Sequence, residues 1–197
     1  QDPMTSLNPT QTVGNQILEV LNLHFPEMSR TEKVKRVDEM MTLVGIPPER
    51  KNSYPHEFSG GMKQRIVIAM ALVAEPELLL ADEPTTALDG TIQAQILELM
   101  QQLREKFNTS VMLITHDLGV VAQFCDSVSV VYAGRVVEFG PVETVFQRKE
   151  NHPYTAGLFN CIPNLEDDQP RLHPIAGHMA DPRKEYKGCC FADRCEY

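Results

Sequence analysis

The stretch over residues 58–89, FSGGMKQRIVIAMALVAEPELLLADEPTTALD, decides the fold. It begins with Ser59, Gly60 and Gly61, which open a predicted helix over residues 62–74. Backbone N–H groups and the positive end of a helix dipole would then face outward, as an anion site requires. The helix is apolar around most of its circumference, so we expect it to be largely buried.

Two short apolar runs follow, and each ends in polar side chains. Residues 77–81 lead into Asp82 and Glu83, and residues 110–115 lead into His116. Apolar runs of this length fit strands buried on both faces of a parallel sheet. Side chains at the carboxyl ends of such strands lie where α/β sheets bind their ligands.

In this order and spacing the residues resemble the ATP-binding cassette (ABC) ATPases. Residues 59–64 resemble the family signature, residues 78–83 the Walker B strand and residues 87–89 the D-loop. The resemblance implies an α/β fold: a partial P-loop NTPase cassette with a parallel sheet, a helical subdomain and a C-terminal extension. The corresponding regions are residues 1–75, 76–140 and 141–197.

The resemblance also implies roles for individual residues in ATP hydrolysis. Glu83 would be the general base, His116 would bridge the γ-phosphate and the water, and Asp82 would hold Mg²⁺. The cofactors implied are therefore ATP and Mg²⁺. The signature and D-loop residues implied to bind the nucleotide held by an opposite subunit are Ser59, Gly60, Gly61, Gln64 and Asp89.

The first residues, QDPMTSLNP, resemble the Q-loop of the family. Gln1 would reach Mg²⁺ and the attacking water. No G-x-x-x-x-G-K-[ST] stretch occurs in the 197 residues. We therefore expect a fragment that starts at the Q-loop, binds ATP poorly by itself and hydrolyses none. A truncated sheet would also leave apolar strand faces and an edge uncovered.

The helices before the signature fit a helical subdomain. Residues 12–23 carry an amphipathic pattern, and Ser29 with Glu32 forms a capping box before a second helix that Gly45 ends. By resemblance, this subdomain receives the membrane subunit. Beyond the D-loop we predict helices over residues 91–106 and 118–124, and a hairpin of strands 128–132 and 135–139 that turns at Ala133 and Gly134.

The C-terminal tail resembles the oligopeptide, dipeptide and nickel importers, through HPYT at residues 152–155 and the segment 188–195. Some members of that subfamily carry a [4Fe–4S] cluster, which usually takes four thiolates. Cys189 and Cys195 would be its ligands, with Cys190 either incidental or a substitute. The alternative is a tail with ordinary thiols. We expect Cys125 and Cys161 to be small buried residues.

Composition agrees with a soluble subunit. The chain is 42% hydrophobic and 23% charged, and its net charge of −9 argues against a nucleic-acid partner. No apolar run approaches a membrane span. The resemblance implies an ATP-driven motor of a peptide or nickel importer, peripheral on the cytoplasmic face of the membrane. Its partners would be a second, different ATPase subunit, two permease subunits and, indirectly, a substrate-binding protein.

A second class of function stays open on the sequence alone. Non-transport cassette proteins act on nucleic acid or ribosomes, but they usually carry two cassettes or long coiled-coil insertions, and this chain shows neither. The transported substrate is not determined by the sequence, because the binding protein and the membrane pore select it.

Overall fold

The computed structural model describes residues 2–86, 88–148, 150–162, 175–181 and 183–197. The chain divides into two compact units, residues 1–116 and residues 117–197. The three regions expected from the sequence follow the family rather than this division, and they stay a prediction.

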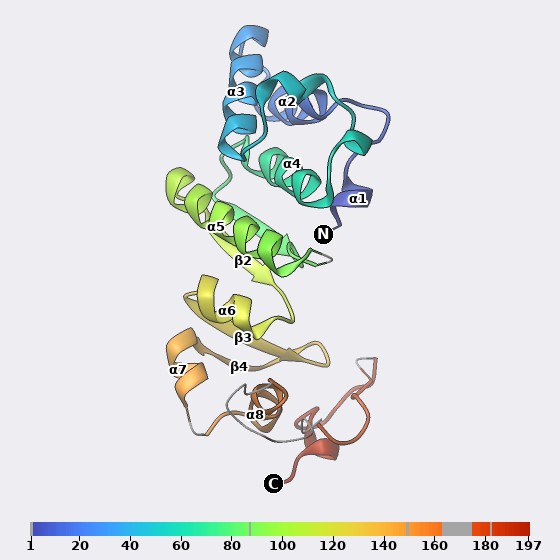
Figure 1. Ribbon diagram of the computed structural model, residues 1–197. Coiled ribbons are helices and arrows are strands. Elements are labelled where there is room, and N and C mark those ends of the chain that lie inside the picture. Colours follow the sequence, from blue (N-terminus) through green and yellow to red (C-terminus); the bar gives the residue numbers. More distant parts are fainter. Residues whose placement is uncertain (1, 87, 149, 163–174, 182) are drawn as a thin grey trace. The chain divides into compact units, whose positions relative to one another are not determined.

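Unit 1 contains most of the helices and a parallel strand pair (Figure 1). Its elements are α1 (Pro3–Ser6), α2 (Val13–His24), α3 (Arg30–Leu43), the 3₁₀ turns η1 (Pro48–Asn52) and η2 (Pro55–Glu57), α4 (Gly60–Leu72), β1 (Leu78–Asp82), α5 (Gly90–Phe107) and β2 (Ser110–Ile114).

Helices α2, α3 and α4 pack on one another through a shared apolar core. The fully buried side chains there include Ile17, Leu21, Met41, Val44 and Ile66. The predicted capping box is confirmed: Glu32 N donates to Ser29 Oγ over 3.3 Å, and Ser29 N donates to Glu32 Oε2 over 3.0 Å. Two orphan donors at the start of α3 are satisfied in this way.

Helix α4 begins two residues earlier than the apolar pattern suggests and ends two residues earlier. Ser59 is its N-cap, so the helix starts at Gly60 directly after it. The helix stops at Leu72, and Glu75 beyond it has a φ of 50°. A left-handed residue breaks the helical path and turns the chain toward β1.

Strand β1, helix α5 and strand β2 form the predicted βαβ unit. The strands are parallel, with Leu78 opposite Ser110 and Asp82 opposite Ile114. This register places the ends of both strands at the same edge. Asn108 closes α5 in the left-handed conformation with a φ of 51°.

The expectation that these strands are buried on both faces is wrong. Leu78 and Leu80 are 52% and 64% exposed, and Met112 and Ile114 are 55% and 52% exposed. The described sheet has two strands, so alternate side chains on one face have no covering layer. The expected uncovered apolar face of the sheet is confirmed.

Unit 2 contains α6 (Leu118–Phe124), β3 (Ser127–Tyr132), β4 (Arg135–Pro141), α7 (Val142–Gln147), α8 (Pro153–Asn160) and the 3₁₀ turn η3 (Ala192–Arg194). Strands β3 and β4 form the predicted antiparallel hairpin. Ala133 and Gly134 at its turn have φ values of 48° and 77°, the positive pair that a type I′ turn requires.

The C-terminal segment packs on this hairpin through aromatic side chains. Tyr132 and Phe191 are 2% exposed, and their rings meet edge to face with centroids 5.2 Å apart. Arg194 holds the preceding loop in place: Nε donates to the carbonyl of Ala176 over 2.7 Å, and Nη2 donates to that of Ile175 over 2.9 Å. The tail is therefore an ordered part of unit 2 where it is described.

Candidate functional site

The acidic end of β1 lies beside the end of β2, as the parallel register requires. Asp82 is the last residue of β1, and the Glu83 backbone N–H donates to the carbonyl of Ile114 over 2.9 Å. Hydrogen bonding thus continues one residue past the strand pair. It brings the side chain of Glu83 to the residues that follow β2.

Glu83 is held in an unusual backbone conformation, with a φ of 50°. A left-handed conformation costs free energy in a non-glycine residue, and residues of this kind concentrate at functional sites. The left-handed residue ends the extended path of β1 and begins a turn. The following Thr86 N–H donates to the Glu83 carbonyl over 3.2 Å and closes the turn.

Both carboxylate oxygens of Glu83 have a partner. His116 Nδ1 lies 2.8 Å from Oε1, and the Thr86 hydroxyl donates to Oε2 over 2.5 Å. The Thr86 hydroxyl, and after it the His116 ring, hold the pKa of Glu83 below its ordinary range. Each carboxylate oxygen has two lone pairs, so the group can still accept a hydrogen bond from a water molecule.

The sequence alone did not indicate Thr86. Its signal is local: a hydroxyl residue two positions after Pro84, in a turn that follows a strand, is suited to bond back to the residue that opens the turn. The structure adds it to the acid and the histidine as the third member of the arrangement.

We expect Thr86→Val to change the pH dependence of hydrolysis in the full-length protein. Loss of the hydroxyl removes the largest cause of the lowered pKa, so the pKa of Glu83 should rise. As the pH falls, the Glu83 carboxylate would become protonated at a higher pH than in the unaltered protein. Activity would therefore be lost at a higher pH. At neutral pH kcat should drop by about threefold to tenfold, because one of the groups that orient the carboxylate is gone.

A pH–rate profile of kcat between neutral and acidic pH would measure this effect. Thr86→Ser keeps the hydroxyl and is the matched control, with an acid limb expected where the unaltered protein has it. An unmoved acid limb in Thr86→Val would show that the Thr86 hydrogen bond does not tune Glu83.

The signature residues lie at the start of α4. Ser59 caps the helix, accepting from Met62 N over 3.4 Å, and Ser59 and Gly60 are exposed. The helix therefore presents its first N–H groups at an accessible turn, which suits an anion. Gln64, by contrast, is only 4% exposed, so its side chain lies on the buried side of α4.

The remaining predicted residues are placed as follows. Asp89 is exposed and caps α5, accepting from Ile92 N over 3.0 Å. Asp82 presents a half-buried carboxylate at the end of β1, next in sequence to Glu83. A carboxylate at this edge is a suitable oxygen ligand for Mg²⁺. Gln1 lies outside the described residues, so its predicted role stays a prediction.

The tail thiols of Cys189, Cys190 and Cys195 form no metal-binding group among the residues that the structure describes. Cys190 is 5% exposed and its Sγ lies 3.6 Å from the carbonyl oxygen of Tyr132, so this thiol faces the packed interior. Cys189 is exposed, with Sγ 3.8 Å from Nε2 of His152. Throughout the described part of the chain, no group of three or more His, Cys, Asp or Glu residues could hold a metal ion.

The expectation that Cys125 and Cys161 are buried is also wrong. Both are half-buried, because each is the C-cap of a short helix, α6 and α8 respectively, where the chain turns toward the surface. At both positions the backbone N–H group bonds back into the preceding helix.

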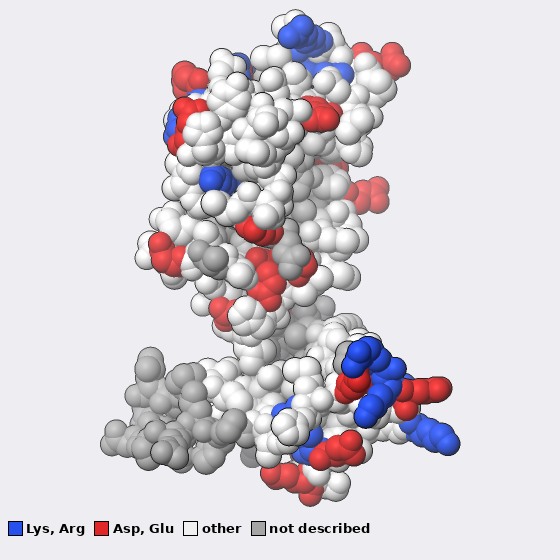
Figure 2. All heavy atoms as spheres, turned by 90° about the vertical axis from the view of Figure 1, so that its right-hand side faces the viewer, with Lys and Arg blue, Asp and Glu red and all other residues white. Residues whose placement is uncertain are grey.

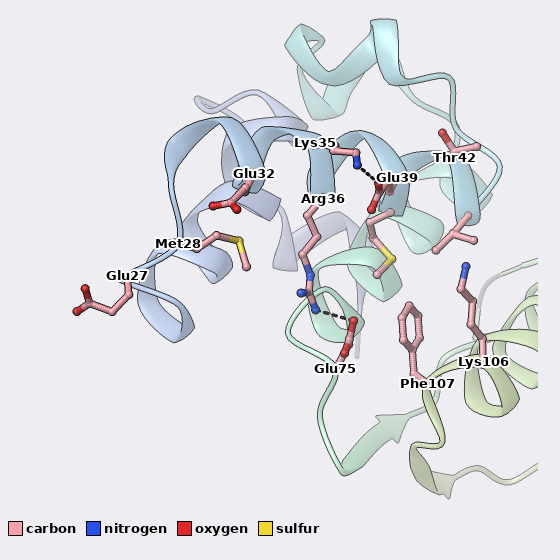
Figure 3. A pocket seen from close by; sticks show the side chains of 12 residues that line it. Glu27, Met28, Glu32, Lys35, Arg36, Glu39, Thr42, Glu75, Lys106 and Phe107 are labelled. Carbon is pink, nitrogen blue, oxygen red and sulfur yellow. Dashed lines mark ion pairs between the residues drawn. The ribbon is translucent and has the colours of Figure 1, made fainter.

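A groove of about 880 Å³ lies elsewhere on unit 1, between α3 and the end of α5. Arg36 crosses it: its Nη2 lies 2.7 Å from Glu75 Oε1, and its Nε donates to the carbonyl of Val73 over 2.9 Å (Figure 3). Lys35 pairs with Glu39 along α3 over 3.6 Å. None of the predicted site residues that the structure describes lines this groove, so it is separate from the Glu83 site.

No helix in the described ranges combines the length and the apolar character needed to cross a bilayer.

Two family models match the chain. The model described as ABC transporter matches residues 1–86, and the model described as oligopeptide/dipeptide transporter, C-terminal region, matches residues 137–197. The second match covers the tail in which HPYT occurs. The first model thus matches the N-terminal part of the chain and the second matches the C-terminal part. They correspond to the two resemblances seen in the sequence.

Curated relatives match over the whole chain. The dipeptide transport ATP-binding protein DppD of Bacillus subtilis is 55% identical over 99% of this chain and 58% of that protein. The oligopeptide transport ATP-binding protein OppD of Bacillus subtilis is 56% identical over 100% of this chain and 55% of that protein. OppD of Salmonella typhimurium is 50% identical over 100% of this chain and 59% of that protein. The chain thus spans between 55% and 59% of the length of these relatives.

Solved structures agree with the fold. One is cbiO1 from Clostridium perfringens, part of the ABC transporter complex cbiONQ, with a TM-score of 0.65 and 32% identity over 75% of this chain and 57% of that chain. Another is the ATP-binding cassette MJ0796 in a post-hydrolysis dimer bound to ADP and Pi. Its TM-score is 0.59, with 31% identity over 69% of this chain and 59% of that chain. Over nearly its whole length the chain is therefore similar to ABC transporter ATPases that carry the oligopeptide/dipeptide transporter C-terminal region.

Proposed function

We propose that the full-length protein is the ATP-hydrolysing subunit of a peptide importer. The observation that carries the proposal is the carboxylate of Glu83, fixed at the end of β1 by His116 and Thr86. A preorganised, ionised carboxylate in a turn after a Walker B-like strand is suited to accept a proton from the water that attacks the γ-phosphate. The relatives are dipeptide and oligopeptide transport ATP-binding proteins, which supports peptides as cargo.

The residues divide the work of hydrolysis as follows. Glu83 orients the water and takes its proton, and His116 keeps the carboxylate in place and contacts the γ-phosphate. Asp82 would hold Mg²⁺, which supplies charge neutralisation on the phosphate oxygens when bound. The first turn of α4, with Ser59 and Gly60 exposed, donates N–H groups to the γ-phosphate held by the opposite subunit.

The proposed partners follow from this division of roles. A second ATPase subunit, different from this one, completes each ATP site, and two permease subunits dock on the helical subdomain. The protein would then be peripheral on the cytoplasmic face of the membrane. An iron–sulfur cluster is not included in the proposal, because the described part of the chain brings no metal-binding group together at Cys189, Cys190 and Cys195.

Action on nucleic acid or ribosomes is the less favoured function. On the face drawn in Figure 2, the described basic side chains are interspersed with acidic ones and do not form a broad continuous surface. A net charge of −9 repels a phosphate backbone. The curated relatives above are transport proteins.

Affinity purification of the full-length protein from membranes tests the proposal. We expect permease subunits to copurify, and we expect the purified complex in vesicles to take up a labelled dipeptide or oligopeptide only with ATP. Glu83→Gln should abolish this uptake. Glu75→Gln is the control for that variant, because Glu75 lies outside the site although its φ is the same 50°. Copurification with ribosomes or DNA, without permeases, would contradict the proposal.

A further inference from the structure

The two glycines of the signature have different surroundings. A Cβ built on Gly60 would meet only Leu88 Cδ2, at 4.0 Å, which is an ordinary contact. A Cβ built on Gly61 would lie 2.7 Å from Ile92 Cγ2 and within 4.0 Å of two further Ile92 atoms. Carbon atoms cannot approach to 2.7 Å, so a side chain at Gly61 and Ile92 compete for one space.

The main chain of Ile92 is fixed from the D-loop side. Its N–H donates to the carboxylate of Asp89, which caps α5. Ile92 is β-branched and half-buried in the first turn of α5, and such side chains have one strongly preferred rotamer in a helix. The methyl group that reaches Gly61 therefore has little freedom to move aside.

We propose that Ile92 is a positioning residue for the signature turn. Its Cγ2 methyl occupies the notch that the missing side chain of Gly61 leaves, and this contact sets how closely the first turn of α4 approaches α5. The inference rests on the proposed function, because the placement of this turn matters when its N–H groups bind a phosphate. Position 61 then requires glycine because the Ile92 methyl group fills the space that a side chain would need. The space beside Gly60 stays free for the ligand.

The contact also joins two motifs, the signature at Gly61 and the D-loop that ends at Asp89, which are distant in sequence but adjacent in space. Asp89 accepts a hydrogen bond from the Ile92 N–H, and the Ile92 side chain lies against Gly61. A shift of Asp89 would therefore also shift the group that contacts Gly61. A packed contact of this kind transmits displacement, because interiors are close to crystalline density and have low compressibility. Misplacing a phosphate-binding turn by roughly 1 Å can lower a rate about a hundredfold.

A double-mutant cycle tests the proposal in the full-length protein assembled with its partner ATPase subunit. We expect Gly61→Ala to lower kcat by about tenfold to a hundredfold, since the new methyl pushes α4 away from Ile92. Gly61→Ala combined with Ile92→Ala should return to within about threefold of the unaltered protein, because the two methyl groups no longer overlap. ATP affinity of the isolated subunit should stay unchanged throughout, since this turn acts on the nucleotide of the opposite subunit.

A second variant covers the case in which Gly61→Ala fails to fold. Ile92→Leu keeps the atom count but lacks the Cγ2 methyl, so kcat should fall while the melting temperature stays the same. Ile96→Val, one turn further along α5, trims a buried side chain that faces no signature glycine and should leave kcat unchanged. A normal kcat in Ile92→Leu, or a double variant as inactive as Gly61→Ala, would overturn the proposal; the latter would show that the nucleotide itself requires Gly61.

ATP-driven association of the two ATPase subunits in a Glu83→Gln background separates this inference from the proposed function. Association that the signature variants weaken and the double variant restores supports both. No ATP-driven association even with an intact signature contradicts the proposed function itself. Association that is normal in Gly61→Ala contradicts only the role of Ile92.

Discussion

Glu83→Gln in the full-length protein is expected to abolish ATP turnover and to leave ATP binding intact. The amide keeps the size of the side chain, so the Thr86 hydroxyl can still donate to its oxygen. It cannot take a proton from water, and the loss of a general base costs about a hundredfold to ten-thousandfold in rate. Steady-state phosphate release and binding of a fluorescent ATP analogue would measure the two quantities.

Glu75→Gln provides the matched control for this variant. Glu75 is also a left-handed, non-glycine residue with a φ of 50° and precedes the same strand, but its carboxylate pairs with Arg36. Turnover should therefore stay near that of the unaltered protein. If Glu83→Gln hydrolysed ATP at the normal rate, Glu83 would not be the base.

His116→Ala is expected to have the second largest effect. The ring is the partner of Glu83 Oε1 at 2.8 Å, and the His116 side chain is 81% exposed, so it is accessible to a γ-phosphate. Its removal takes away both the orientation of the base and a donor to the phosphate, which is worth about a hundredfold to a thousandfold in kcat. KM for ATP should change little, because the lost contacts matter most in the transition state.

The control for this variant is His24→Ala. His24 is an exposed histidine in the last turn of α2 and has no part in the Glu83 arrangement. Combining His116→Ala with Thr86→Val should cost less than the sum of the two effects in free energy, because both residues act through one carboxylate. An undiminished kcat in His116→Ala would remove the histidine from the mechanism.

Much of the local structure follows directly from patterns in the sequence. The capping box of Ser29 and Glu32, the succession of β1, α5 and β2, and the turn at Ala133 and Gly134 are confirmed. Each depends on residues within a few positions of one another, where hydrogen-bonding groups and side-chain periodicity leave few alternatives. The motifs that identify the family are of the same local kind.

Burial was the property that these patterns predicted least well. The runs over residues 77–81 and 110–115 are as apolar as strands covered on both faces, yet alternate side chains of the described sheet are exposed. Cys125 and Cys161 are small and apolar but lie at helix ends. Apolar character records a preference for burial, whereas the neighbouring layer decides whether burial is achieved.

The sequence by itself indicated the resemblance to the ABC ATPases, the order of elements and the candidate acid and histidine, because these lie in contiguous motifs. Only the tertiary structure decided that Thr86 completes the Glu83 site, that Cys190 faces the core, and that Gly61 differs from Gly60. Those distinctions depend on which atoms fill a given space. Contacts between side chains on different elements, such as Gly61 against Ile92, arise from the packing of whole helices and leave no periodic signal in the chain.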